Sequence, residues 1–195
     1  MKHHTIGARL LAALLPLVCA AGIALPAAAA DYPAVLMNAG LATEKAGSYH
    51  VEMTESFGAK AMTSSGDMQS TSPMKMRMTS QMPEGTMEMI ILAPDSYMKI
   101  GSAPWKKYPG NPSDFSQMDF HTLLAKNKDS FAVTDLGMMT RDGQALHAYK
   151  IVNQTKNSTQ TVFLDSAGRF ARLEMPKVVM KFSNFGEPIN IVAPM

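Results

Sequence analysis

The sequence predicts an α+β protein in which a curved antiparallel β-sheet carries helices packed on its concave face. Polar and apolar residues alternate over most of the chain, as in "SYHVEMTESF" at residues 48–57, and this is the period of a half-buried strand. Glycine, proline and aspartate separate these segments at short intervals, as expected for hairpin turns. Helical segments do not alternate with the strands, so a parallel sheet built from crossover helices is not predicted.

Residues 1–30 are expected to be a cleaved secretory signal peptide. Lys2 and Arg9 make its start basic, an apolar run follows, and the run ends in small residues at Ala30, as a signal peptidase requires. Pro16 and Pro26 interrupt the apolar run, which argues against a membrane-spanning helix. We therefore expect cleavage near Ala30, a periplasmic or secreted protein, and no transmembrane anchor in the mature form.

The mature chain, residues 31–195, is expected to form a single domain, because about 165 residues suffice for one core. The only cysteine, Cys19, lies in the signal, so disulfides, thiolate metal sites and cysteine nucleophiles are excluded for the mature chain. Removing Lys2 and Arg9 leaves 18 − 2 = 16 basic residues against 16 acidic ones. A formally neutral chain gives no electrostatic reason to bind nucleic acid.

The first half of the mature chain predicts one short helix and a series of strands. In "YPAVLMNAGLATEKAGS", Val35, Leu36, Ala39 and Ala42 recur at helical spacing, and Gly47 is suited to end the helix. The strands expected after it cover residues 48–57, 61–70, 73–82, 85–93, 95–101 and 103–109.

The second half predicts a central helix followed by a further series of strands. Residues 111–130 carry an apolar stripe of Phe115, Met118 and Leu123, with an N-cap at Ser113 or Asp114. The later strands are expected at residues 130–139, 145–154, 158–166, 168–176 and 178–186. "DG" at residues 142–143 and "SAGR" at residues 166–169 are hairpin signals.

Methionines dominate two of the expected strands, in "PMKMRMTSQMPEGTMEMIIL" at residues 73–92. Alternation places Met74, Met76 and Met78 on one face of the first strand. It places a second set on one face of the next strand: Met87, Met89 and Ile91. A loop with an even number of residues between the strands would place both sets on one face of the sheet. "PEG", however, resembles a three-residue turn, which would shift the register by one and mix the faces. We favour the alternation, because burial of a whole face outweighs one turn preference.

Three interpretations of these methionines remain open. Methionine can replace leucine or isoleucine in an ordinary core, although a uniquely packed core uses it sparingly. It can line a deformable apolar cavity that accepts variable hydrophobic ligands. Its thioethers can also bind Cu(I), through Met74, Met76 and Met78, but neighbours on one strand face stand about 6–7 Å apart, which is too far for one ion without a second strand.

The layout of the chain resembles the LolA/LolB and LppX/LprG superfamily of exported lipid- and lipoprotein-binding proteins. The likeness rests on "MEMIILAPDSYMKIGSAPWKKYP", on the late hairpin "LDSAGRFARLEM" and on the closing segment "FSNFGEPINIVAP". These stretches mark turns and strand ends rather than chemistry. The resemblance implies a half-open β-barrel whose concave face, covered by helices, shelters acyl chains, and it implies no catalytic residues. The signal departs from anchored members of the superfamily, because it lacks a lipobox.

The function predicted from the sequence is a non-enzymatic carrier or chaperone for lipid or lipoprotein acyl chains. No nucleophile motif, phosphate-binding loop or zinc spacing occurs, so neither catalytic residues nor a cofactor is expected. An envelope protein is a possible partner, and Cu(I) binding is the alternative function. The residues expected to line the cavity are Leu36, Met74, Met76, Met78, Met87, Met89, Ile91, Phe115, Met118 and Leu123.

Overall fold

The structure, a computed structural model, describes residues 32–57, 60–70, 73–82, 85–109, 131–154 and 157–194. Within these ranges it has one helix, α1 (Tyr32–Lys45), and eleven strands. The strands before residue 110 are β1 (Ser48–Phe57), β2 (Lys60–Gln69), β3 (Lys75–Met82), β4 (Gly85–Leu92), β5 (Asp95–Ile100) and β6 (Lys106–Pro109). The strands after residue 130 are β7 (Phe131–Arg141), β8 (Gln144–Asn153), β9 (Ser158–Leu164), β10 (Phe170–Met175) and β11 (Val178–Ser183).

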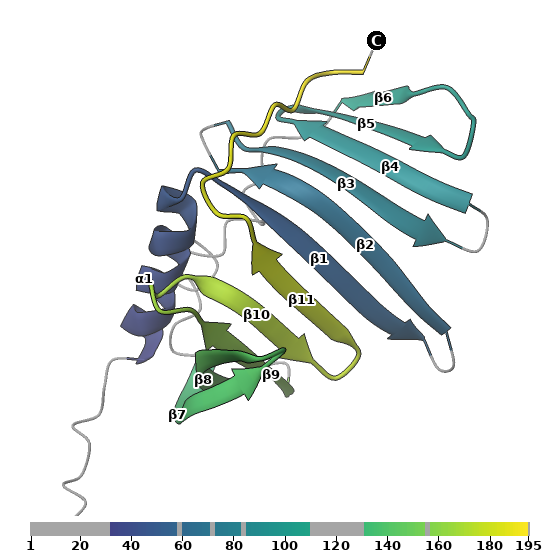
Figure 1. The fold of residues 1–195 in the computed structure, drawn as a ribbon. Helices are drawn as coiled ribbons and strands as arrows, with labels where there is room; N and C mark the ends of the chain where they lie inside the picture. The colour runs from purple at the N-terminus through teal and green to yellow at the C-terminus, as the bar shows by residue number, and fades with distance from the viewer. Residues whose placement is uncertain are drawn as a thin grey trace, which may run out of the picture. The chain divides into compact units, whose positions relative to one another are not determined.

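All eleven strands belong to one antiparallel sheet, in the order β6-β5-β4-β3-β2-β1-β11-β10-β9-β8-β7 (Figure 1). Neighbours in the sheet are also neighbours in the chain, except where β1 pairs with β11. The sheet is curved but not closed, since β6 and β7 stand at its two ends. The predicted fold class, a half-open antiparallel barrel with helical cover on its concave face, is confirmed.

Helix α1 packs on the concave side of the sheet, against the half formed by β7 to β11. Leu36 and Ala39 are fully buried there. The Thr43 hydroxyl donates to the Ala39 carbonyl, 2.8 Å away, and accepts a hydrogen bond from the backbone N–H of Phe170. Gly47 follows the helix with a φ of 79°, a left-handed conformation that glycine adopts without strain. These contacts tie the end of the helix to the start of β10.

The main hydrophobic core lies between α1 and this half of the sheet. We call the helix side of the sheet its inner face and the opposite side its outer face. Ile151 and Val162 are completely buried on the inner face, beneath Leu36. A smaller cluster of Leu146, Ala148 and Phe163 is buried on the outer face of β8 and β9. The β8–β9 pair is therefore apolar on both sides.

The strands agree closely with the prediction from alternation and turn signals. β1 covers residues 48–57 as expected, and the other strands lie within the predicted segments to within two or three residues at each end. The predicted central helix, residues 111–130, lies outside the described residues, as does the signal segment. The predicted "DG" turn joins β7 to β8, with Asp142 and Gly143 both at positive φ.

Candidate functional site: the methionine face

The register of the first six strands gathers their methionines on the inner face. Met78 lies opposite Met89, and Met89 lies opposite Met98, so three thioethers form a row across β3, β4 and β5. Residues that lie directly opposite each other in an antiparallel pair have side chains on the same face. The inner-face methionines of β1 to β5 are Met53, Met62, Met68, Met76, Met78, Met82, Met87, Met89 and Met98. We call this surface the methionine face.

The predicted alignment of β3 with β4 is confirmed. Met76 pairs with Ile91 and Met78 with Met89, as the alternation required. The alternative based on a three-residue "PEG" turn is wrong, because Gly85 pairs with Met82 as the first residue of β4. Only two residues therefore separate the strands. Burial of one continuous apolar face has outweighed the local turn preference.

The six predicted lining residues on this hairpin differ in exposure. Met76 and Ile91 are buried, with 4% and 3% of their surface exposed. Met74, which lies just before β3, is half-buried, and so are Met78, Met87 and Met89.

The other predicted lining residues lie away from this hairpin or outside the described residues. Leu36 belongs to the core cluster under α1, together with Tyr149, Ile151 and Val162 on β8 and β9. Phe115, Met118 and Leu123 fall within residues 110–130, outside the described part of the chain. The lining of a cavity by these four side chains therefore stays a prediction.

Sequence reasoning missed part of the methionine face, namely the residues contributed by β1, β2 and β5. Met68 lies opposite Met76, and Met53 continues the row that contains Met87. Polar and apolar residues alternate in β1, β2 and β5, which is the signal that these methionines share one face of their own strand. The alternation within one strand does not specify its register with the neighbouring strand. The structure shows that the methionines extend over five adjacent strands.

Small residues occupy the middle of the methionine face. Ser64 on β2 and Ser80 on β3 are buried opposite each other, and their hydroxyls are hydrogen-bonded at 2.8 Å. Gly66 lies next to them, opposite Met78. The hydrogen bond gives each hydroxyl oxygen a partner and so lowers the cost of burying these polar groups in an apolar surface. Long, flexible methionine side chains thus surround a central patch of short residues, Ser64, Gly66 and Ser80, which we call the Ser64–Ser80 floor.

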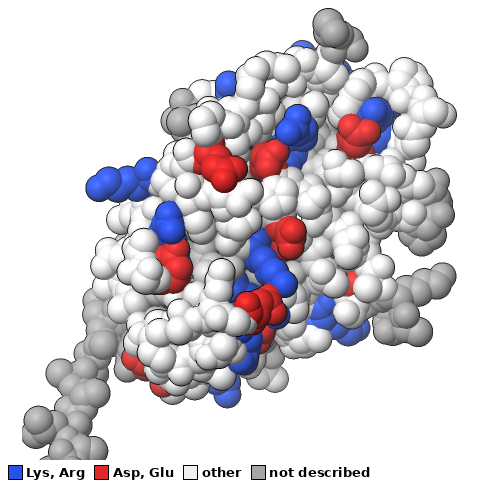
Figure 2. All heavy atoms as spheres, in the orientation of Figure 1, with Lys and Arg blue, Asp and Glu red and all other residues white. Residues whose placement is uncertain are grey.

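The outer face is polar, and its charges are paired across the strands. Figure 2 shows acidic and basic side chains side by side rather than in blocks of one sign. Arg77 donates to Asp67, Lys99 pairs with Glu88 at 2.8 Å, and Lys107 pairs with Asp95 at 2.7 Å. Exposed pairs of this kind add little stability individually. They do give the two faces opposite character.

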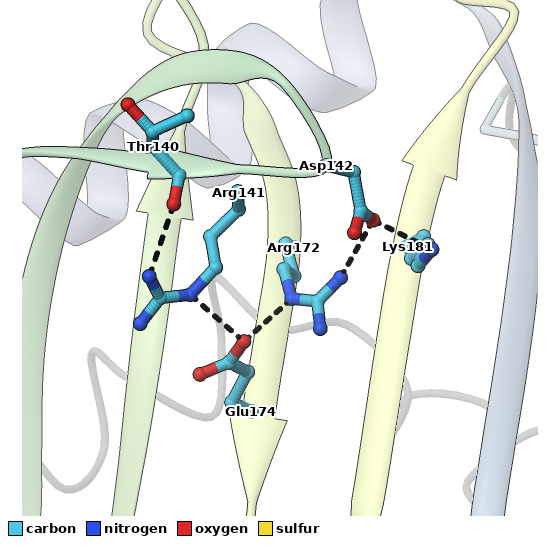
Figure 3. Close-up of polar contacts among 6 residues, drawn as sticks. All are labelled: Thr140, Arg141, Asp142, Arg172, Glu174 and Lys181. Atoms are coloured by element: carbon cyan, nitrogen blue, oxygen red, sulfur yellow. Dashed lines mark hydrogen bonds and ion pairs between the residues drawn. The ribbon is translucent and has the colours of Figure 1, made fainter.

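A longer charge network crosses β7, β10 and β11 on the outer face (Figure 3). Glu174 accepts hydrogen bonds from Arg141 and Arg172, and Asp142 contacts Arg172 and Lys181. The hydrogen bond from Lys181 is the main cause that lowers the pKa of the Asp142 carboxyl below its usual range. Each carboxylate thus lies between two cations.

Asp142→Asn is expected to make the protein less sensitive to acid. A carboxyl whose pKa is lowered by folding stabilises the folded state above its unfolded pKa, which is about 3.9, and this stability is lost as pH falls through the folded pKa. Asparagine tolerates the left-handed φ of 49° at this position. Urea unfolding at pH 7, 4, 3 and 2 measures the effect. The variant should lose less stability than the wild type below pH 4, and equal losses would contradict the prediction.

Two cavities among the described residues lie on the outer face. One, of about 220 Å³, lies between the hydrogen-bonded side chains of His50, Asp67 and Arg77 and the C-terminal segment at residues 184–190. Burial would raise the pKa of the Asp67 carboxyl, but hydrogen bonds from His50 and Arg77 outweigh it and hold the pKa below its usual range. The other, of about 290 Å³, is lined mainly by Glu52, Thr54 and polar residues of β2 and β3. Neither is apolar.

Two further searches cover only the part of the chain that the structure describes. Its histidines and carboxylates form no group of three or more that could hold a metal ion. The same residues include no helix that is long and apolar enough to cross a membrane.

No protein-family model matches the sequence, and neither does any curated protein sequence. Solved structures, however, share its fold. The lipoprotein LppX of Mycobacterium tuberculosis is 15% identical, with a TM-score of 0.61 over 82% of this chain and 97% of LppX. MucB is 10% identical, with a TM-score of 0.58 over 86% of this chain and 64% of MucB. At these identities the similarity is one of fold. The chain therefore has the fold of LppX, an open antiparallel half-barrel.

Proposed function

We propose that the protein is an exported, non-enzymatic carrier or chaperone that binds acyl chains of lipids or lipoproteins in an apolar cavity over the methionine face. The observation that carries this proposal is the assembly of methionines from β1 to β5 on one side of the sheet. Unbranched thioether side chains re-pack at little cost, so such a surface accepts acyl chains of different length and shape. An ordinary core needs no such concentration of one flexible residue.

The contrast between the two faces supports the same function. Charged pairs cover the outer face, as seen at Asp67–Arg77 and Glu88–Lys99, whereas the inner face of β3 and β4 carries only methionine, isoleucine, serine and glycine. An acyl chain on the inner face would therefore meet apolar side chains on both flanks of the Ser64–Ser80 floor. The superfamily resemblance of the sequence supports the same ligand class, a periplasmic or secreted location, and delivery to or from an envelope protein.

Analysis of co-purified lipid tests this proposal directly. We expect mass spectrometry of an organic extract of the purified protein to detect acyl lipids, and a fluorescent fatty acid to bind with displacement by unlabelled lipid. A protein that is consistently empty and ignores the fluorescent fatty acid would contradict the proposal. Titration with Cu(I) against a chelator, on the wild type and on a Met74→Leu, Met76→Leu, Met78→Leu variant, tests the copper alternative. That variant should keep lipid binding.

Met89→Glu is expected to weaken fatty-acid binding by at least about tenfold, because an acyl chain would then have to desolvate a carboxylate in the centre of the methionine row. The matched control is Gln81→Glu, which adds the same charge to the exposed outer face of β3. Fluorescence titration measures both affinities, and circular dichroism checks that both variants are folded. Equal affinities for Met89→Glu and Gln81→Glu would place the ligand elsewhere.

A further inference from the structure

Two consecutive lysines on the edge strand β6 point to opposite faces of the sheet. Lys107 lies opposite Tyr97 on the outer face, where its Nζ is 2.7 Å from Asp95 Oδ2 and 6.0 Å from the centre of the Tyr97 ring. Lys106 lies opposite Met98, which is in turn opposite Met89. Lys106 is therefore on the inner face, at the end of the methionine row. The sequence "WKK" gave no means of telling the two lysines apart.

Lys106 differs from the other cations of β3 to β6, which are Lys75, Arg77, Lys99 and Lys107, because it lies on the inner face of the sheet. On the outer face of β3 to β6, Arg77, Lys99 and Lys107 are each ion-paired. On the inner face of the same strands, Lys106 is the single charged residue, since the register places only methionine, isoleucine, serine, glycine and tyrosine beside it. Within the described residues Lys106 has no hydrogen bond or ion pair, and its side chain is exposed.

The surroundings of Lys106 combine an open edge with an apolar path. Ile100 and Tyr108 lie on the same face at this edge and are exposed, with 43% and 42% of their surface accessible. From Lys106 the row continues through Met98, Met89 and Met78. Strands are about 4.8 Å apart, so the path from β6 to β1 is about 24 Å, the length scale of a long acyl chain. A cation at one end of such a path matches an amphiphile with an anionic head.

We propose that Lys106 binds the anionic head group, a carboxylate or phosphate, of an amphiphile whose acyl chain lies along the methionine row. This inference rests on the proposed function and specifies its ligand class. The lysine stem packs against apolar neighbours while the ammonium group stays at the edge, in contact with water and the head group. Because the ion pair is exposed at an edge, its contribution is modest and depends on ionic strength. Lys106 thus selects among amphiphiles, and the methionines provide most of the affinity.

The test compares Lys106→Gln with its matched control, Lys107→Gln, for three amphiphiles with the same alkyl chain: a fatty acid, an alkyl phosphate and the fatty alcohol. Displacement of the fluorescent fatty acid measures the three affinities. We expect Lys106→Gln to weaken binding of the acid and the phosphate about threefold to fivefold at low salt, and to leave the alcohol unchanged. Lys107→Gln should leave all three affinities unchanged. The difference between acid and alcohol should shrink at high salt.

The possible results separate this inference from the proposed function. If all three amphiphiles bind and Lys106→Gln changes none of the affinities, the role of Lys106 is overturned and the carrier function stands. If Lys106→Gln weakens the alcohol as much as the acid, the lysine acts through packing, and the charge-based inference is again overturned. If the wild type binds none of the three, the proposed function fails and the inference with it.

Discussion

Phe163→Ala is expected to lower the free energy of unfolding by about 4 kcal/mol, the largest effect anticipated for a single substitution in this chain. Phe163 is 0% exposed and packs with Leu146 and Ala148 on the outer face of β8 and β9. The Arg141 guanidinium lies 5.0 Å from the centre of its ring and belongs to the charge network of β7, β10 and β11. Truncation to alanine would leave a void beneath this network, which is held by hydrogen bonds and cannot collapse freely.

Urea unfolding followed by circular dichroism measures the loss, and Phe163→Leu is the graded control, with an expected cost of about 1.5 kcal/mol or less. Leucine keeps most of the buried volume but loses the ring face under Arg141. If Phe163→Ala unfolds at the same urea concentration as the wild type, the outer cluster contributes nothing to stability, and the fold depends on the inner core alone.

Gly66→Ala is the second substitution with a large expected effect, a loss of about 3 kcal/mol in the free energy of unfolding. Gly66 is buried in the middle of β2, opposite Met78. A Cβ atom at this position would collide with the carbonyl oxygen of Arg77 and lie 2.9 Å from the Cα of Met78. Both obstacles are backbone atoms of β3, so no side-chain rotation relieves the contact. The pairing of β2 with β3 would have to open at the centre of the methionine face.

Thermal unfolding of Gly66→Ala and of Ser65→Ala separates this steric effect from a general effect of alanine in β2. Ser65 is the preceding residue and is exposed on the outer face, so its replacement should leave the melting temperature nearly unchanged. Lipid binding should also fall in Gly66→Ala, at temperatures where the variant remains folded. A melting temperature equal to that of Ser65→Ala would show that β3 yields to the added methyl group.

Much of the fold could be predicted from local patterns in the sequence. The alternation of Tyr49, Val51 and Met53 with polar residues predicts β1 with its observed bounds, and Asp142–Gly143 predicts the β7–β8 turn. Both signals act within a few residues, through the pleat of the strand and the positive φ of a tight turn. The alignment of β3 with β4 could be predicted for a related reason, because a register shifted by one residue would have divided the methionines between the two faces.

The rest depended on pairings between segments, which alternation alone does not specify. The sequence predicts Leu36 on a helix opposite the methionine strands, and its place in a cavity lining stays a prediction. In the structure Leu36 is buried with Ile151 and Val162, because α1 packs on the half of the sheet formed by β7 to β11. Alternation in a strand places Lys106 and Lys107 on opposite faces, and the register of β5 with β6 determines which of them is on the inner face. Strand β6 has only four residues, too few for its polar and apolar pattern to predict its register. The ion pair between Lys107 and Asp95 depends on that register and so could not be predicted from the sequence.

The strand order has a consequence for how the chain reaches its native state. Every neighbouring pair except β1–β11 is consecutive in the chain, so each can form at a low entropic cost of loop closure. The β1–β11 pair alone joins segments from the two ends, with Met53 opposite Met180. Contacts of such large sequence separation are the ones that slow folding. Formation of the β1–β11 pair should therefore limit the folding rate. The strands β1 to β6 and the strands β7 to β11 can each pair with their chain neighbours before it forms.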